Sequence, residues 1–236
     1  MKKRFLAFMI LLMLCTPPCA SAWNGPEYHY YGNREEPRVC ITIDDWYEPA
    51  LLTDFMAIAE EYGVKLTLYP CGMNLNEADR ALWQAALDAG HEIGSHGYRH
   101  IGYTQLNNRQ IKREYERFQE ALDQTLGYAY EFLTVRLPYG DGMKLGPRSQ
   151  LALAIHDAGF DHVVFWDWDN TKDLKSALKK IQNGSIVLMH ANRSDLKFFQ
   201  ALMEGLRDRS YEYVTVTELL GITTRLIPRE EGAQYE

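Results

Sequence analysis

Residues 39–46 read Val-Cys-Ile-Thr-Ile-Asp-Asp-Trp, an apolar run of strand length that closes on two adjacent carboxylates. A second stretch, residues 90–100, reads Gly-His-Glu-Ile-Gly-Ser-His-Gly-Tyr-Arg-His and places His96 and His100 four positions apart. Two imidazoles and a carboxylate are a ligand set of catalytic zinc that leaves one position open for water. The two stretches together therefore indicate a metal hydrolase.

Apolar runs of strand length alternate with helical patterns along most of the chain. Strands are expected at residues 39–43, 64–69, 91–94, 132–135, 162–165, 186–189 and 211–214. Helices are expected at residues 51–62, 76–89, 108–126, 148–158, 174–181 and 196–207. This alternation favours an α/β fold with a parallel sheet, which is either a barrel or an open doubly wound sheet.

The two ends of the chain differ in composition from its centre. Residues 1–22 combine a basic start, an apolar run and the small residues 20–22, which together predict a signal peptide that is removed. A retained anchor helix is the alternative, although the apolar run is short for a bilayer. Residues 23–37 are expected to form an irregular lead-in, residues 38–225 one domain, and residues 226–236 a polar tail. An exported chain is expected in the periplasm or outside the cell.

Charge limits the classes of partner. The chain has 25 basic and 32 acidic residues, and three basic residues lie in residues 1–22, which leaves the processed chain with a net charge of −10. Since no basic run could follow a phosphate backbone, we expect no nucleic-acid partner. A neutral or cationic substrate fits this surface better than a polyanion, and nothing in the sequence implies a stable protein partner.

Two cysteines, Cys40 and Cys71, remain after removal of the signal peptide. Export would permit a disulfide between them. However, Cys40 lies near the start of its predicted strand and Cys71 just beyond the end of the next strand. This offset along the strands is long for a disulfide, so we expect two buried thiols.

Polar residues with catalytic potential follow the ends of five predicted strands. They are Asp44 and Asp45 after the first, His96 and His100 after the third, Arg136, Pro138 and Tyr139 after the fourth, Trp166, Asp167 and Asp169 after the fifth, and His190 after the sixth. In a parallel barrel all strands end at one rim, where catalytic groups gather. We therefore expect these distant segments to converge on a single site.

Each of these motifs also has a simpler explanation when it is taken alone. Asp44 and Asp45 could cap a helix, Arg136 could lie in a surface turn, and His190 could be structural. As functional groups, Arg136 could keep a carboxylate ionised, the peptide N–H of Tyr139 could face an oxyanion, and His190 could be a general acid. The remaining histidines are expected to be structural, because the sequence shows no partner for them: His29, His91, His156 and His162.

Taken in order, these segments resemble the five motifs of the polysaccharide deacetylase family, which is also called carbohydrate esterase family 4 or the NodB-homology domain. The similar stretches are Thr42-Ile43-Asp44-Asp45, His96-Gly97-Tyr98-Arg99-His100, Arg136-Leu137-Pro138-Tyr139-Gly140, Trp166-Asp167-Trp168-Asp169 and Ile186-Val187-Leu188-Met189-His190. The resemblance covers about residues 38–222. It implies a distorted (β/α) barrel of about seven parallel strands and a metal-dependent N-deacetylase that acts on acetylated amino sugars.

The resemblance also implies a role for each matching residue. Asp45, His96 and His100 would bind a divalent metal, Asp44 would be the general base, Arg136 its orienting partner and His190 the general acid. The residues alone leave open which aspartate is the ligand. Zinc is the expected ion, and cobalt, nickel or manganese could use the same ligands.

Three departures from the family pattern concern the surroundings of the site. Trp46 replaces the usual glycine after the aspartate pair, and we expect it to narrow the mouth of the site or to stack on a sugar. Gly97 replaces the usual Ser or Thr, which removes an outer hydrogen bond to the metal ligands. The fourth motif is shifted, so the partner that tunes His190 is left open between Asp167, Asp169 and Asp173. Together with Trp46, the side chains of Trp166 and Trp168 are expected to line a substrate groove.

Two alternatives to an N-deacetylase remain open. The same residues could remove O-acetyl groups from a polysaccharide such as xylan. A catalytically silent carbohydrate-binding homologue is the second alternative, although a binding protein has no need of an acid–base pair.

Overall fold

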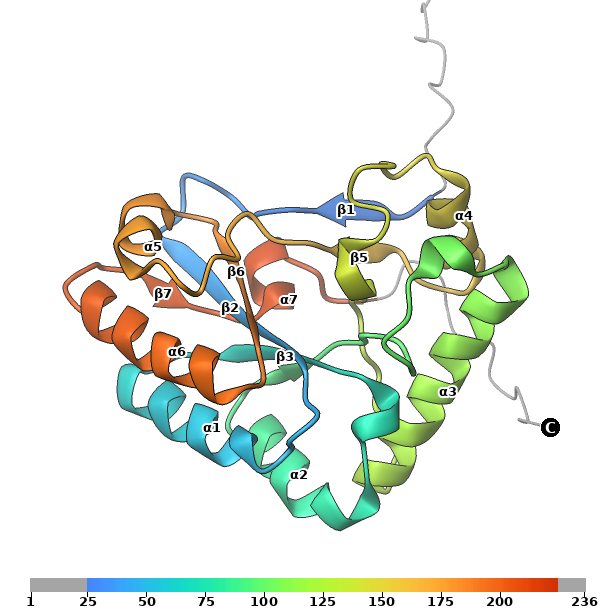
Figure 1. Ribbon diagram of the computed structural model, residues 1–236, viewed down its shortest axis with the longest axis horizontal. Helices are drawn as coiled ribbons and strands as arrows, with labels where there is room; N and C mark the ends of the chain where they lie inside the picture. Colours follow the sequence, from blue (N-terminus) through green and yellow to red (C-terminus); the bar gives the residue numbers. More distant parts are fainter. Residues whose placement is uncertain (1–24, 225–236) are drawn as a thin grey trace, which may run out of the picture.

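A central parallel sheet organises residues 25–224, the part of the chain that the computed structural model describes. The predicted signal peptide and polar tail, residues 1–22 and 226–236, lie outside the described residues. The sheet runs in the order β4-β3-β2-β6, and β7 also pairs with β2 (Figure 1). Its strands are β2 (Arg38–Asp45), β3 (Leu66–Pro70), β4 (Glu92–Ile93), β6 (Ile186–His190) and β7 (Glu212–Tyr213). All of these pairs are parallel.

A second, two-stranded sheet joins β1 (Glu27–His29) to β5 (His162–Val164), again in parallel. Single-residue bridges connect the two sheets: Val135 bridges to Ser95, which follows β4, and to Val163 in β5. Beyond β5, Trp168 bridges to Val187 in β6, which is a strand of the first sheet. The strands thus curve into a distorted (β/α) barrel, as expected.

Two expectations about the strands were wrong. Residues 23–37 are not wholly irregular, because β1 lies among them; it is three residues long and has too little pattern to be recognised from sequence. The expected strand at residues 132–135 is reduced to the bridge at Val135. Phe132 and Val135 are fully buried, so this apolar run reflects core packing rather than strand pairing.

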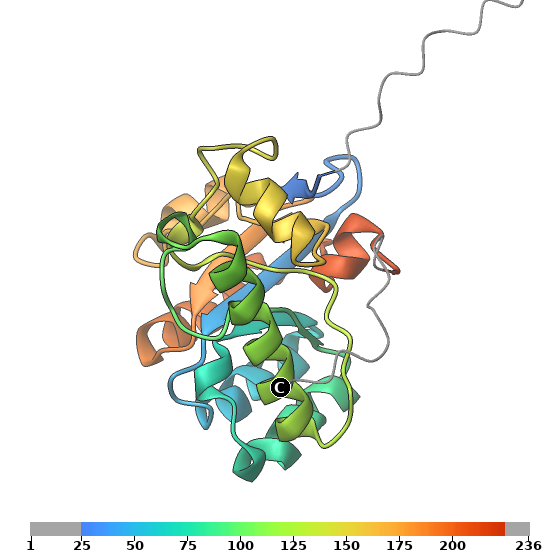
Figure 2. The ribbon, with the colours of Figure 1, turned by 90° about the vertical axis from the view of Figure 1, so that its right-hand side faces the viewer.

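Helices cover the outside of the barrel (Figures 1 and 2). They are α1 (Leu51–Tyr62), α2 (Arg80–Asp88), α3 (Asn108–Leu126), α4 (Gln150–Asp157), α5 (Leu174–Lys180), α6 (Arg193–Leu206) and α7 (Val216–Leu220). Short 3₁₀ turns lie between them: η1 (Gly72–Asn74), η2 (Glu77–Asp79), η3 (Tyr103–Gln105) and η4 (Pro138–Gly140). None of the helices within residues 25–224 combines the length and the apolar composition that a membrane span requires.

The longest helix, α3, shows how local sequence fixes an element. Asn107 and Gln110 form a reciprocal capping box that satisfies free N–H groups at the start of the helix. Gly127 ends it with a φ of 83°, a conformation that costs glycine little. Between these ends, a buried apolar face packs on the barrel through Ile111, Tyr115, Phe118, Leu122 and Leu126. Figure 2 shows α3 beside α4.

The two cysteines are free and fully buried, as expected. Cys40 lies in β2, and Cys71 directly follows β3. Burial raises the pKa of both thiols, so they are unreactive members of the core.

Candidate metal centre

Three side chains from two distant segments meet beyond the ends of β2 and β4. Asp45 is the last residue of β2, and His96 and His100 follow β4. Asp45 Oδ1 lies 3.5 Å from His96 Nε2 and 3.3 Å from His100 Nε2. One ligand atom from each residue lies within 4.8 Å of the other two. This is the trio that the sequence singled out.

The chemistry of this trio fits a divalent metal. Asp45 Oδ1 is buried and has no hydrogen-bond partner among the described residues, which is costly for a carboxylate unless a cation binds it. Burial alone would raise the pKa of Asp45, but the adjacent His96 and His100 lower it below its ordinary value. Burial and His96 lower the pKa of His100, which favours the neutral imidazole that binds metals.

His96 is held in one orientation by the backbone around it. Its Nδ1 donates a hydrogen bond to the carbonyl oxygen of Arg136 at 2.9 Å, which leaves Nε2 as the nitrogen with a free lone pair. The backbone N–H of His96 donates to Pro70 O at 3.2 Å and ties the loop to the end of β3. The ligand nitrogen is therefore positioned before any ion arrives.

Gly97 stands where the family usually has Ser or Thr, and the structure explains this departure. Its φ is 77°, and a Cβ at this position would lie 2.4 Å from Tyr103 Oη. Tyr103 is fully buried and fills the space that a larger residue would need. The outer hydrogen bond of His96 is accepted by the carbonyl oxygen of Arg136 instead.

A buried ion pair lies beside the trio. Arg136 Nη1 donates to Asp44 Oδ1 at 2.9 Å, and both side chains are almost completely buried. The guanidinium also donates to Thr42 Oγ1 and to the carbonyl oxygens of Val164 and Phe165. With so many donors engaged, Arg136 holds Asp44 in one orientation and compensates its charge.

His190 ends β6 in register with Asp44 on β2. Its side chain is 46% exposed, so one edge of the ring is open to solvent. Its Nδ1 lies 3.5 Å from Asp195 Oδ2, and its backbone N–H donates to the same oxygen at 2.8 Å. The Asp195 carboxylate raises the pKa of His190, and Asp44 and Asp45 act in the same direction against burial.

The partner of His190 is therefore Asp195 and none of the three aspartates expected from sequence. Asp167 pairs with Arg34 at 2.7 Å. Asp169 accepts a hydrogen bond from Trp166 Nε1 at 2.9 Å, and Asp173 caps α5 by accepting from the backbone N–H of Ser176. The position of Asp195 in the sequence could have indicated this contact, because it lies five residues after His190, in the first turn of α6.

Two tryptophans expected near the substrate are in the core. Trp46 is fully buried and donates from Nε1 to Ile43 O at 2.9 Å. Trp168 is 5% exposed and stacks on Phe198. Neither lines a groove. Trp166 is partly exposed and lies over Arg136, with 5.7 Å between the guanidinium carbon and the ring centroid, so it remains near the site.

Positive φ angles at non-glycine positions mark the loops of the site. Within residues 25–224 they occur at Asp45 (77°), Trp46 (61°) and Tyr139 (61°). Such conformations cost of order 1–3 kcal/mol each and tend to cluster at functional sites. A φ of 61° at Trp46 is a conformation that suits the glycine of the family pattern, and here it directs the indole into the core, against Phe55 and Trp83.

Two tyrosines flank His100. Tyr139 is 71% exposed; its hydroxyl donates to His100 O at 3.2 Å, and its ring meets the imidazole at 4.4 Å. Tyr47 is also exposed, and its ring centroid lies 6.4 Å from that of His100. Sequence reasoning missed Tyr47.

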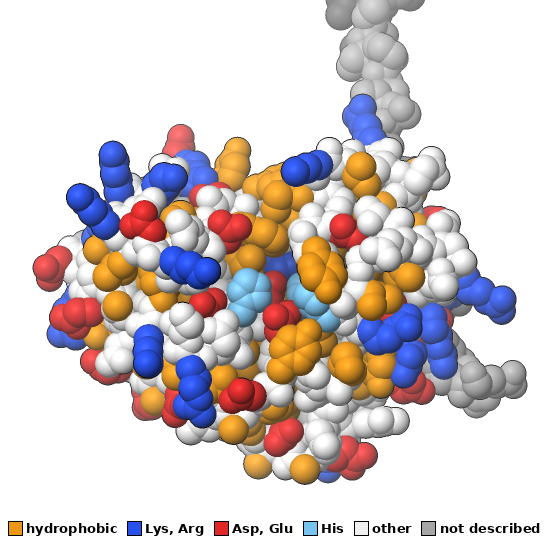
Figure 3. All heavy atoms as spheres, viewed as in Figure 1, with side chains coloured by type: hydrophobic (Ala, Val, Ile, Leu, Met, Phe, Trp, Pro, Cys, Tyr) orange, Lys and Arg blue, Asp and Glu red, His pale blue; other side chains and the backbone are white. Residues whose placement is uncertain are grey.

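On the face seen in Figure 3, histidine and acidic side chains lie together near the middle, with hydrophobic side chains around them.

A family model described as polysaccharide deacetylase matches residues 31–162, more than half of the chain. The chain belongs to the polysaccharide deacetylase family. Its relatives include the uncharacterized protein YlxY of Bacillus subtilis, which is 27% identical over 213 residues. They also include the peptidoglycan-N-acetylglucosamine deacetylase PgdA of Listeria monocytogenes, which is 25% identical over 200 residues. The matches cover 86% and 84% of this chain, but only 63% of YlxY and 41% of PgdA.

Solved structures of this family share the fold. A Bacillus anthracis protein described as a CE4 family pseudoenzyme superposes with a TM-score of 0.70 at 22% identity, over 82% of this chain and 69% of its own. The Bc1960 peptidoglycan N-acetylglucosamine deacetylase gives a TM-score of 0.70 at 21% identity, over 84% of this chain and 94% of its own. The NodB-like barrel is thus confirmed.

Proposed function

We propose that this protein is a metal-dependent deacetylase that removes N-acetyl groups from an amino-sugar polymer. The observation that carries the proposal is the buried, unbonded Asp45 Oδ1, which faces His96 Nε2 and His100 Nε2. These three residues would hold the ion, for which zinc is the expected choice. Asp44 and His190, which are register partners on β2 and β6, supply the two groups that acid–base hydrolysis requires.

The ion, when bound, supplies a Lewis acid that polarises the acetyl carbonyl and lowers the pKa of water. Asp44 accepts a proton from the water that attacks the carbonyl carbon. Arg136 orients Asp44, since it binds Oδ1 and leaves Oδ2 for the proton. The N–H of Tyr139, in the turn η4 that follows Arg136, would donate to the developing oxyanion.

His190 then donates a proton to the departing amine, so the products are acetate and a free amino sugar. This step needs a protonated imidazole near neutral pH. The Asp195 carboxylate supports that state by raising the pKa of His190. The half-exposed ring is open to the solvent side of the site, from which a polymer would approach.

Peptidoglycan is the substrate class that we propose. Among the relatives are peptidoglycan-N-acetylmuramic acid deacetylases of Bacillus subtilis, at 24% identity, besides PgdA. We propose with it that the chain is exported to the periplasm or the cell exterior, where this polymer lies. The acidic surface expected from the sequence also argues against a nucleic acid as substrate.

A second candidate function is the removal of acetyl groups from xylan. It is favoured by a bifunctional xylanase/deacetylase of Pseudobutyrivibrio xylanivorans, which is 25% identical over 188 residues. The likeness to a pseudoenzyme keeps the catalytically silent alternative in view. The complete set of Asp44, Arg136, His190 and the metal trio supports an active enzyme instead.

Acetate release tests the proposal and separates its alternatives. Metal-free protein would be reloaded with zinc, cobalt, nickel or manganese and incubated with chitin oligomers, peptidoglycan and acetyl-xylan. We expect metal-dependent release from the N-acetylated polymers. Release from acetyl-xylan alone would favour the esterase. Glycan binding by fully metallated protein without release from any of these polymers would identify a silent homologue.

A further inference from the structure

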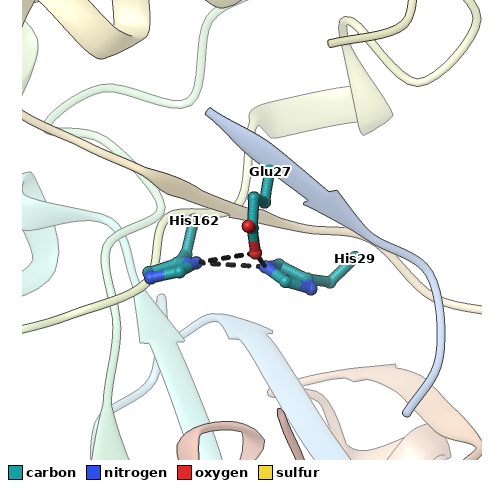
Figure 4. Close-up of side chains that lie close together, drawn as sticks. All are labelled: Glu27, His29 and His162. Atoms are coloured by element: carbon teal, nitrogen blue, oxygen red, sulfur yellow. Dashed lines mark hydrogen bonds and ion pairs between the residues drawn. The ribbon is translucent and has the colours of Figure 1, made fainter. Parts of the chain in front are cut away.

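A second cluster of metal-ligand side chains lies on the two-stranded sheet. Glu27 and His29 are two residues apart in β1, so they project from the same face of the strand. His162 is the register partner of Glu27 on β5. Figure 4 shows these three side chains, here named the Glu27 cluster, pointing toward one another from the two strands.

The donor atoms of the Glu27 cluster are spaced as in a metal site. His29 Nε2 lies 3.1 Å from His162 Nδ1, and Glu27 Oε2 lies 3.7 Å from the first nitrogen and 3.9 Å from the second. Two ligands of a tetrahedral zinc are about 3.3 Å apart, given bonds of about 2.0–2.1 Å. One ligand atom from each residue lies within 4.8 Å of the other two, as in the trio of Asp45, His96 and His100.

A hydrogen bond between the two rings explains only part of this arrangement. The carboxylate of Glu27 is too far from either nitrogen for a hydrogen bond, yet it faces both. The histidine side chains are 16% and 8% exposed, and Glu27, at 61%, leaves an entry path from solvent. Burial lowers the pKa of His29 to about 4 and also lowers that of His162, so both rings are neutral.

The strand backbones hold the Glu27 cluster in place. The backbone N–H of Glu27 donates to Asp161 O, and that of Phe165 donates to His29 O, both at 2.7 Å. Tyr28 points to the opposite face of β1, where its ring centroid lies 5.1 Å from that of Phe165. The ligands therefore sit on a fixed frame rather than on a mobile surface loop.

We propose that Glu27, His29 and His162 form a second divalent-metal site, of the zinc class, that fastens β1 to β5. The site shares no residue with the candidate catalytic centre. After β1 the chain continues to the residues just before β6, where Tyr31 bridges to Ser185 and Gly32 N donates to Gly184 O. A bound ion would thus stabilise the segment that spans β5 and β6, because binding free energy contributes to folding.

Zinc stoichiometry tests this site separately from the catalytic proposal. Metal-free protein would be titrated with zinc alone by calorimetry, and the bound metal counted by elemental analysis after dialysis. We expect two equivalents for the wild type and one for His96→Ala, with the remaining equivalent on the Glu27 cluster. Glu27→Gln should lower the affinity of the Glu27 cluster for zinc about tenfold or more. Because Glu27 is mostly exposed, this variant should fold normally.

Glu35→Gln is the matched control, since it makes the same change at an exposed position of the same segment. It should bind two equivalents with unchanged affinity. A wild type that binds one equivalent, lost in His96→Ala and unaltered in Glu27→Gln, would overturn the second site and leave the proposed function standing. Conversely, zinc retained by the Glu27 cluster in a protein that releases no acetate would defeat only the proposed function.

Thermal unfolding of His96→Ala supplies a second readout that does not depend on counting ions. Zinc at about 100-fold above its dissociation constant should raise the Tm of this variant by roughly 5 °C or more. The rise should disappear when Glu27→Gln and His29→Gln are added. An equal rise with and without these changes would show that zinc stabilises the protein elsewhere.

Discussion

The candidate catalytic centre and the Glu27 cluster use the same ligand types, two histidines and one carboxylate, and differ in what surrounds them. Beside Asp45 stand a carboxylate held by a buried arginine and a half-exposed histidine with its own aspartate. Around the Glu27 cluster the structure shows strand hydrogen bonds, with the aromatic contact of Tyr28 and Phe165 on the opposite face of β1. We therefore expect a ligand trio alone to bind a metal, and the acid–base neighbours to add hydrolysis.

Removal of a ligand from the catalytic centre should have the largest effect on activity. His96→Ala leaves Asp45 and His100, too few ligands for tight binding, and acetate release should fall to background. Activity assays with added zinc, alongside elemental analysis, measure this. A variant that stays fully active with an ion at this centre would break the assignment of His96.

Loss of the general base should come next and should leave the ion in place. Asp44→Asn should lower kcat roughly 10²-fold or more, because proton transfer from water is lost while Asp45 and both histidines remain. Asp54→Asn, an exposed change in α1, is the control and should keep the full rate. Full turnover by Asp44→Asn would remove Asp44 from the mechanism.

Loss of the partner of His190 should have a moderate effect with a clear pH signature. Asp195 raises the pKa of His190, so Asp195→Asn should lower it, and the acid form should be lost at a lower pH. The alkaline limb of kcat/KM should therefore shift toward lower pH. Asp169→Asn, at a position expected from sequence to tune His190, should leave the alkaline limb of kcat/KM at the wild-type pH. An unmoved limb in Asp195→Asn would argue that another group is the acid.

Changes in the Glu27 cluster should have the smallest effect on catalysis. Glu27→Gln should keep kcat within about twofold of the wild type under saturating zinc, because the cluster contributes no group to the reaction. The same variant should lose part of the stabilisation by zinc, measured by thermal unfolding. A large fall in kcat with unchanged stability would mean that the two regions are not separate in function.

Much of the fold followed from local sequence. The helices α1 and α3 begin and end at the predicted residues, because amphipathic spacing and glycine ends are local signals. The strands β2 and β6 were also located, since their buried apolar runs are long. By contrast, β1 has three residues and gains its structure from a partner more than 130 positions away, which no local pattern reveals.

The same division applies to the site. The segments carrying Asp45, His96 and His190 could be selected because each follows a predicted strand. The contact between Asp195 and His190 depends on where α6 begins, and the burial of Trp46 depends on a positive φ in the turn before α1. The approach of His29 to His162 depends on strand register. These features arise from three-dimensional packing.

The central claim is that Asp45, His96 and His100 hold one ion beside Asp44. Anomalous X-ray diffraction at the zinc edge, from crystals of zinc-loaded protein, tests it most directly. The account predicts an anomalous peak about 2.0–2.2 Å from Asp45 Oδ1 and from Nε2 of both histidines. Diffraction from zinc-loaded crystals with no peak at this position would contradict it.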